Sequence, residues 1–113
     1  MSKSKYDNYM KRFAFKMYLN KGAAEEYKKR HDAIWPDLVS LLKNTGIEDY
    51  SIFLDEESST LFGVLKISQP EALDTLPGKE IMKKWWDHMK DIMQTNPDNS
   101  PVNIPLKEVF HLN

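Results

Sequence analysis

Tyr27 and His31 are the two residues of this 113-residue chain whose types and spacing most directly allow chemistry. They lie four positions apart, so on a helix both side chains project from the same face. An imidazole with a reference pKa of about 6.5 can donate and recapture a proton at physiological pH. Ile34 and Leu38 extend the same face, which places the pair at the edge of an apolar surface. Acid–base catalysis is one interpretation, and a structural histidine at the end of a helix is the other.

The adjacent residues Trp85 and Trp86 are the second candidate. Successive residues of a helix are about 100° apart, so the two rings cannot both occupy the centre of one core face. One of them is therefore expected to face a cavity. An aromatic ring can pack on the C–H groups of a sugar while nearby polar groups bind its hydroxyls. A sugar-binding site and an ordinary pair of core residues both fit this pattern.

The remaining residues that could take part in chemistry are given structural interpretations. His88 lies in a charged stretch and is expected to face solvent, and the orientation of His111 on a terminal strand stays open. The sequence has no histidine or carboxylate spacing typical of a metal site and no glycine-rich phosphate loop. We therefore predict neither a metal nor a cofactor. Four methionines are interpreted as flexible fillers of the core: Met17, Met82, Met89 and Met93.

Composition excludes several classes of protein. The 16 Lys and Arg residues are balanced by 17 Asp and Glu residues, a formal net charge of −1, which argues against a nucleic-acid or anionic-membrane partner. The lack of cysteine excludes disulfides, thiolate nucleophiles and zinc sites that use sulfur. The sequence has no apolar run of about 18 residues and no secretory signal, so we expect a soluble cytoplasmic protein.

Hydrophobic periodicity locates the elements that must position these side chains. Residues 12–19 alternate as a strand with one buried face. Residues 23–44 carry apolar side chains at helical spacing, and Pro36 should divide this segment into two helices at an angle. Gly46 stands where the second helix should end. Residues 1–10 have no usable period and are predicted to be a flexible N-terminal extension.

The second half of the chain predicts a hairpin, a helix and a last strand. Residues 47–54 and 60–68 should pair as antiparallel strands. A short helix should follow Pro70, and residues 79–93 should form a longer amphipathic helix. A proline-containing loop then leads to a predicted strand over 106–112.

The predicted order over residues 11–113 is that of a single α+β domain, a ferredoxin-like βαββαβ sandwich. Its helices would cover one face of the sheet and leave the other face, with apolar side chains, bare. A second copy of the chain is the simplest cover for that face. We therefore expect a homodimer, a dimeric α/β barrel-type assembly.

Five separated strings make residues 11–113 similar to the L-rhamnose mutarotase family. They are YKKRHDAIWPDL at 27–38, YSIFL at 50–54, KWW at 84–86, NPDNSP at 96–101 and EVFHL at 108–112. The resemblance implies a cytoplasmic, cofactor-free isomerase, built as a homodimer, that interconverts the α and β anomers of L-rhamnose. It further implies that His31 is the proton donor and that four aromatic residues contact the sugar: Tyr27, Tyr50, Trp85 and Trp86.

The chemistry of mutarotation is compatible with this resemblance. A proton must reach the ring oxygen while one leaves the anomeric hydroxyl, and an acid and a base suffice for both transfers. His31 would protonate the ring oxygen, and Tyr27 would orient the imidazole or the substrate. Asp98 is a candidate for the partner base. Two alternatives stay open, a catalytically silent sugar-binding module and another enzyme on the same dimeric scaffold.

Overall fold

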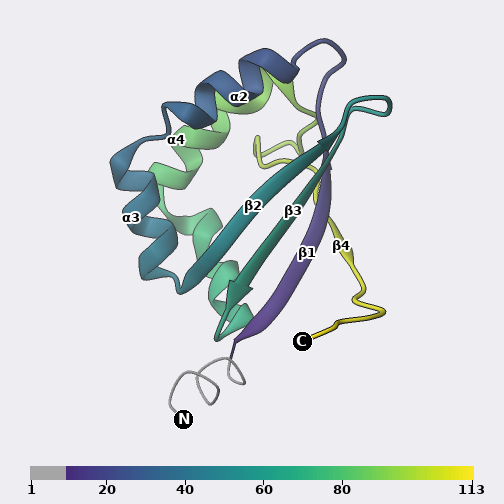
Figure 1. Ribbon diagram of the computed structural model, residues 1–113. Helices are drawn as coiled ribbons and strands as arrows, with labels where there is room; N and C mark the ends of the chain where they lie inside the picture. The colour runs from purple at the N-terminus through teal and green to yellow at the C-terminus, as the bar shows by residue number, and fades with distance from the viewer. Residues whose placement is uncertain (1–9) are drawn as a thin grey trace.

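A computed structural model describes residues 10–113 as two layers, a sheet and a set of helices (Figure 1). The predicted extension over 1–10 lies, apart from Met10, outside the described residues. Two 3₁₀ segments, η1 (Pro70–Gly78) and η2 (Lys90–Ile92), flank the last helix. The strands are β1 (Lys11–Tyr18), β2 (Ile47–Asp55), β3 (Thr60–Ile67) and β4 (Ile104–Leu106), and the helices are α2 (Ala24–Asp32), α3 (Pro36–Asn44) and α4 (Glu80–Met89).

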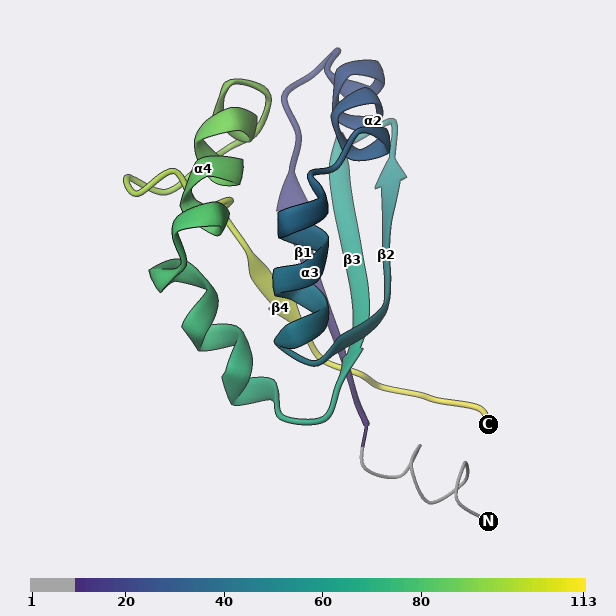
Figure 2. The same ribbon diagram turned by 90° about the vertical axis from the view of Figure 1, so that its left-hand side faces the viewer.

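The sheet is antiparallel throughout, with the strand order β2-β3-β1-β4. All three α-helices lie over one of its faces, as two perpendicular views show (Figures 1 and 2). Among residues 10–113, no helix covers the opposite face. The predicted mixed α/β class, with strands and helices in this succession, is therefore confirmed.

Alternation along β1 and β3 builds the core between the layers. Phe15 and Met17 are each 5% exposed, and every second residue of β3 from Leu61 to Ile67 is buried. These side chains face the helices, because within residues 10–113 the helices are the layer that covers the sheet. The four methionines predicted to fill the core are all buried: Met17, Met82, Met89 and Met93.

Pro36 explains the break between α2 and α3. Proline lacks an N–H group and has a fixed φ, so it is favoured in the first turn of a helix and excluded from the interior. Accordingly α2 ends at Asp32, and α3 begins at Pro36, as predicted. Gly46 follows α3 with φ of 98° and donates its N–H to the Lys43 carbonyl at 3.0 Å. Glycine adopts this left-handed conformation without strain, which confirms its predicted place at the helix end.

The predicted strand over 106–112 is wrong. Only Ile104–Leu106 pairs with β1. Beyond it the chain leaves the backbone ladder, and the Arg12 side chain contacts it instead, 3.0 Å from His111 Nδ1 and 4.0 Å from the Glu108 carboxylate. Glu108 and Val109 interrupt the period-2 pattern of this segment, so neither of its faces would carry all the apolar residues beyond Leu106. All three are exposed to solvent: Val109, Phe110 and Leu112.

Two helix predictions also need correction. The long helix ends at Met89 rather than at Met93, and a 3₁₀ turn replaces its last residues. Met93 is extended because it bridges to Leu19, which draws the chain back toward β1. The segment that begins at Pro70 is 3₁₀ rather than α-helical. Pro77 lies inside this segment and has no N–H to offer an α-helical ladder.

Gly63 provides the space for an aromatic ring in the middle of the inner sheet face. It lies directly opposite Phe15 of β1. A Cβ atom added at Gly63 would stand 2.4 Å from Cζ of that ring. Phe15 is buried, so its ring has little freedom to move aside. Because Gly63 has no side chain, the Phe15 ring can lie over this part of β3.

Replacing Gly63 with alanine should destabilise the fold. The added methyl group would overlap the buried Phe15 ring, and overpacking of this kind costs about 1–3 kcal/mol. Urea denaturation should show a lower midpoint for Gly63→Ala than for the wild type. Gly78→Ala is the matched control, because nothing lies within 4 Å of a Cβ atom built at Gly78. Equal midpoints for the two variants would contradict the packing described for Phe15.

Candidate active site

A cavity of about 1360 Å³ lies between the sheet and the helices. Protein sites for small molecules measure roughly 300–1,000 Å³, so a monosaccharide fits here with room to spare. The structure brings together in this cavity, from α2, β2 and α4, all five residues expected at the site. They are Tyr27, His31, Tyr50, Trp85 and Trp86.

His31 and Tyr27 contact each other on one face of α2, as their spacing predicts. Their ring centroids are 4.3 Å apart, and His31 Nδ1 lies 3.1 Å from the Tyr27 backbone carbonyl oxygen. A carbonyl oxygen only accepts hydrogen bonds, so this partner assigns the proton of the neutral ring to Nδ1. Nε2 of the neutral imidazole then carries the lone pair.

Burial sets the charge state of three of the titratable side chains that line the cavity. Desolvation lowers the pKa of His31, against smaller opposing effects of the Tyr27 carbonyl and of Asp32. The imidazole is therefore neutral at pH 7. Burial also raises the pKa of Tyr27, and it raises the pKa of Tyr50 to about 12. Both phenols keep their protons at neutral pH and can donate hydrogen bonds.

Tyr50 is partly open to solvent, with 38% of the residue exposed. Its raised pKa reflects the surroundings of the hydroxyl alone, which lies among protein atoms. The ring centroid is 6.2 Å from that of Phe15 on the inner face of the sheet. Tyr50 thus reaches from the accessible edge of β2 into the cavity.

The two tryptophans occupy different places, as their positions on the helical wheel predict. Trp85 is 6% exposed, and its ring stands nearly perpendicular to those of His31 and Trp35, at centroid distances of 5.4 and 5.0 Å. Trp86 is half-buried. Trp85 therefore packs edge to face against the imidazole, while Trp86 keeps part of its ring accessible.

Three uncharged polar residues of the cavity wall were not singled out from the sequence. They come from the loop before β4, and an ordered backbone holds them: the Asn96 N–H donates to the Ser100 carbonyl at 2.8 Å. Amide and hydroxyl groups of this kind suit the recognition of sugar hydroxyls. For Asn96 and Ser100 the available signal was the string at 96–101, which contributes to the family resemblance, whereas Asn103 lies outside it. The three residues are Asn96, Ser100 and Asn103.

Asp98, the predicted candidate base, borders a separate shallow depression beside Trp86 and does not line the cavity. Its carboxylate accepts hydrogen bonds from the N–H and the hydroxyl of Ser100, and these bonds lower its pKa. Stabilising the ionised form makes a carboxylate a weaker base. The geometry gives this assignment no support.

The other two histidines lie outside the cavity. His88 is exposed, as predicted, although its ring centroid is 5.5 Å from those of both Trp35 and Trp85. His111 is exposed beside Arg12. Within residues 10–113, no group of three His, Cys, Asp or Glu side chains could hold a metal ion. None of the described helices is long and apolar enough to cross a membrane.

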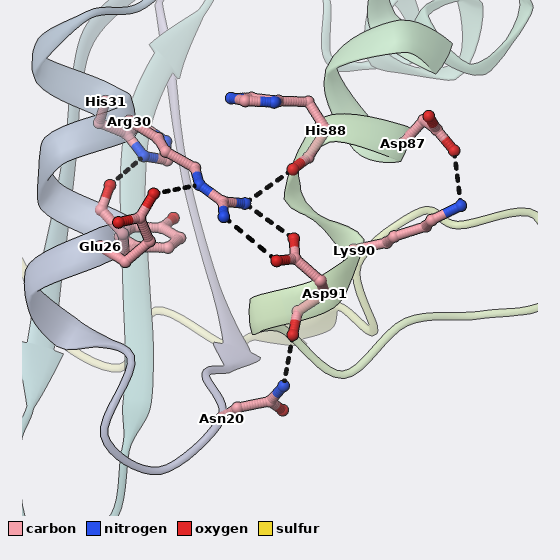
Figure 3. Close-up of polar contacts among 9 residues, drawn as sticks. Asn20, Glu26, Arg30, His31, Asp87, His88, Lys90 and Asp91 are labelled. Carbon is pink, nitrogen blue, oxygen red and sulfur yellow. Dashed lines mark hydrogen bonds and ion pairs between the residues drawn. The ribbon is translucent and has the colours of Figure 1, made fainter.

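Arg30 joins the part of α2 that carries His31 to the end of α4 (Figure 3). Its guanidinium donates to Glu26 at 2.8 Å, to the His88 backbone carbonyl at 2.7 Å, and to both carboxylate oxygens of Asp91 at 2.8 and 3.2 Å. The Arg30 side chain is 15% exposed. These hydrogen bonds lower the pKa of Glu26 and of Asp91. We call this set, Arg30 with its three acceptors, the Arg30 clasp.

Fold and site together define a class of protein, a small two-layer α/β domain whose cavity holds a neutral histidine among aromatic side chains. A family model described as L-rhamnose mutarotase matches residues 12–112. The chain belongs to the L-rhamnose mutarotase family. The resemblance seen in the sequence is confirmed.

Similar proteins agree with this family. An L-rhamnose mutarotase from Formosa agariphila is 58% identical, over 91% of this chain and 99% of its own length. Another from Brucella anthropi is 58% identical, over 89% of this chain and 95% of its own. A crystal structure of L-rhamnose mutarotase from Formosa agariphila superposes with a TM-score of 0.85 at 57% identity, covering 91% of this chain and 99% of the other. The fold is thus that of a solved mutarotase.

Removing the Arg30 clasp should destabilise the protein in a pH-dependent way. Because the two carboxyl pKa values are lowered in the folded state, their contribution is fully present above about pH 5 and is lost as the pH falls through the lowered values. Arg30→Met should therefore lower the urea midpoint at pH 7, and its deficit relative to the wild type should shrink at pH 3. Lys90→Met, which breaks only the exposed Lys90–Asp87 pair, should change little. A deficit that is the same at both pH values would contradict this account.

Proposed function

We propose that this chain is an L-rhamnose mutarotase, an isomerase that interconverts the α and β anomers of L-rhamnose. The observation that carries the proposal is His31, whose Nδ1 is bound to the Tyr27 carbonyl and whose other nitrogen is left for the cavity. The family and its named relatives support the same activity. They lend no support to a silent sugar-binding module.

His31 can serve both proton transfers of the reaction through Nε2. The neutral nitrogen takes the proton of the anomeric hydroxyl, and the imidazolium that results donates it to the ring oxygen. The C1–O5 bond then breaks while the C1 oxygen becomes the aldehyde carbonyl. Rotation about C1–C2 and the reverse transfers give the other anomer. Since both oxygens are bonded to C1, one nitrogen can reach each in turn, and His31 acts as the proton donor without a separate base.

The four aromatic residues would hold the sugar against this nitrogen. Tyr27 and Tyr50 have protonated hydroxyls that can donate hydrogen bonds to sugar oxygens. The accessible part of Trp86 offers an apolar ring face for the C–H groups of the sugar. Trp85 packs edge to face against the His31 imidazole and restricts its orientation. These four residues and the neutral His31 carry no charge, which suits a neutral substrate, although charged side chains such as Lys28 and Asp32 also line the cavity.

We also propose that the domain, residues 11–113, is ferredoxin-like and works as a cytoplasmic homodimer of the α/β barrel type. The strand order β2-β3-β1-β4 supports that classification. The outer face of the sheet carries apolar side chains that no described helix covers. Phe53 on this face is 63% exposed, and Ile104 and Leu106 on β4 are each 40% exposed. A second copy that packs sheet against sheet would bury them.

His31→Asn should abolish anomer exchange and leave sugar binding largely intact. Losing a general acid–base group lowers rates by about 10²- to 10⁴-fold. Saturation-transfer proton NMR on L-rhamnose at equilibrium measures exchange directly, as magnetisation passing between the two anomeric signals. His88→Asn is the matched control, because His88 also packs on Trp85 but lies outside the cavity. Exchange near the wild-type rate in His31→Asn would overturn the assignment.

Phe53→Asp should dissociate the proposed dimer. A carboxylate at this position would have to be desolvated between the two sheets, which opposes association. Sedimentation velocity should show the wild type at twice the monomer mass and the variant at the monomer mass. Ser40→Asp is the matched control, because it introduces the same carboxylate at an exposed position of α3; it should leave the dimer unaffected. A monomeric wild type at micromolar concentration would contradict the proposal.

A further inference from the structure

Between Ile47 and Tyr50, an irregularity in strand β2 changes which of its side chains point to the inner face of the sheet. At its start, Ile47 lies opposite Ile67 and Glu48 opposite Lys66. Farther along, Ser51 lies opposite Val64. Two residues of β2, Asp49 and Tyr50, therefore stand against the single residue Leu65 of β3. This is a β-bulge, with one extra residue in β2.

The bulge decides on which face of the sheet Tyr50 lies. Ile47 is buried on the inner face, and side chains alternate along a strand, so in a regular strand a residue three positions later would point outward. The extra residue reverses the alternation. Tyr50 consequently shares the inner face with Ile52 and Leu54, and all three line the cavity.

Asp49 has the unusual backbone conformation that the bulge requires. Its φ is 52°, in the left-handed region. Glycine, asparagine and aspartate adopt this conformation most readily, and β-branched residues do so only with strain. The Asp49 carboxylate lies 3.5 Å from Lys66 Nζ, but the side chains are 77% and 38% exposed. An ion pair so exposed contributes little, so the backbone conformation is the more important property of Asp49.

We propose that Asp49 is a positioning residue for the site: its left-handed backbone turns Tyr50 into the cavity. This inference rests on the proposed function, because it assigns Asp49 a part in sugar binding through Tyr50. Asp49 itself does not line the cavity. Its effect on the reaction is therefore expected in KM more than in kcat, as for a residue that acts on substrate binding.

The exchange activity of Asp49 variants should follow how well the new residue tolerates a positive φ, and not its charge. Asp49→Asn and Asp49→Gly should keep exchange within about threefold of the wild type, while Asp49→Val should lose about tenfold or more in kcat/KM. Ser59→Val is the matched control. Ser59 also has a positive φ, 58°, but lies in the β2–β3 turn and not in the cavity. It should lose comparable stability without losing exchange.

A double-mutant cycle tests whether Asp49 acts through Tyr50. In a Tyr50→Phe background, Asp49→Val should have a much smaller effect on kcat/KM than in the wild type. Should Asp49→Val fail to fold, Asp49→Ala gives the same comparison with less strain. Full exchange in folded Asp49→Val, or an equal loss in Asp49→Asn, would overturn the inference.

A structural readout separates this inference from the proposed function. Nuclear Overhauser contacts between the ring protons of Tyr50 and Phe15 should be present in the wild type and in Asp49→Gly, and weakened in Asp49→Val. If the wild type shows no anomer exchange, the proposed function fails while this readout still tests the bulge. If the contacts persist in Asp49→Val, the positioning role fails even in an active enzyme.

Discussion

The edge-to-face packing of Trp85 is the interaction on which the helical layer and the site both depend. The ring comes from α4, meets His31 of α2 and meets Trp35 at the start of α3. One buried side chain therefore joins all three helices. In a chain of this size there is a single layer of helices over the sheet, so the residues that form the core must also form the walls of the cavity. Stability and binding are consequently not separable at this position.

Burial acts in the same sense on the three aromatic titratable groups of the cavity. Desolvation lowers the pKa of His31 and raises those of Tyr27 and Tyr50, which drives all three groups toward their neutral forms. Charged groups such as the Arg30 clasp lie at the joint between α2 and η2, where they fix the helices relative to each other. The Arg30 clasp thus joins the helices, while the neutral His31, Tyr27 and Tyr50 offer hydrogen-bond donors and acceptors to a neutral ligand.

Much of the fold could be predicted because its signals are local. The alternation from Phe13 to Leu19 identifies β1, and Pro36 divides the helical segment, since neither depends on distant residues. The strand predicted over 106–112 failed because pairing is decided by the partner strand, and the chain beyond Leu106 contacts β1 only through side chains.

The candidate site was predictable in part. The helical spacing of Tyr27 and His31 is a local property, whereas Tyr50 was expected at the site from the resemblance alone and its inward orientation was not predicted. A signal for the bulge was nevertheless present, because the apolar positions of β2 change from odd, at Ile47, to even, at Ile52 and Leu54. The polar groups of Asn96, Ser100 and Asn103 reach the cavity only through the path of a loop, which periodicity does not describe.

The hydrogen bond from His31 to the Tyr27 carbonyl has a consequence for the robustness of the site. Histidines that transfer protons are often oriented by a carboxylate, which can itself titrate and can be screened by salt. A backbone carbonyl has no net charge and no accessible pKa, and it lies one turn earlier on the same helix. The tautomer of His31 is therefore set by the formation of α2 itself. It should be the same at any ionic strength and at any pH at which the helix is folded and the ring is neutral.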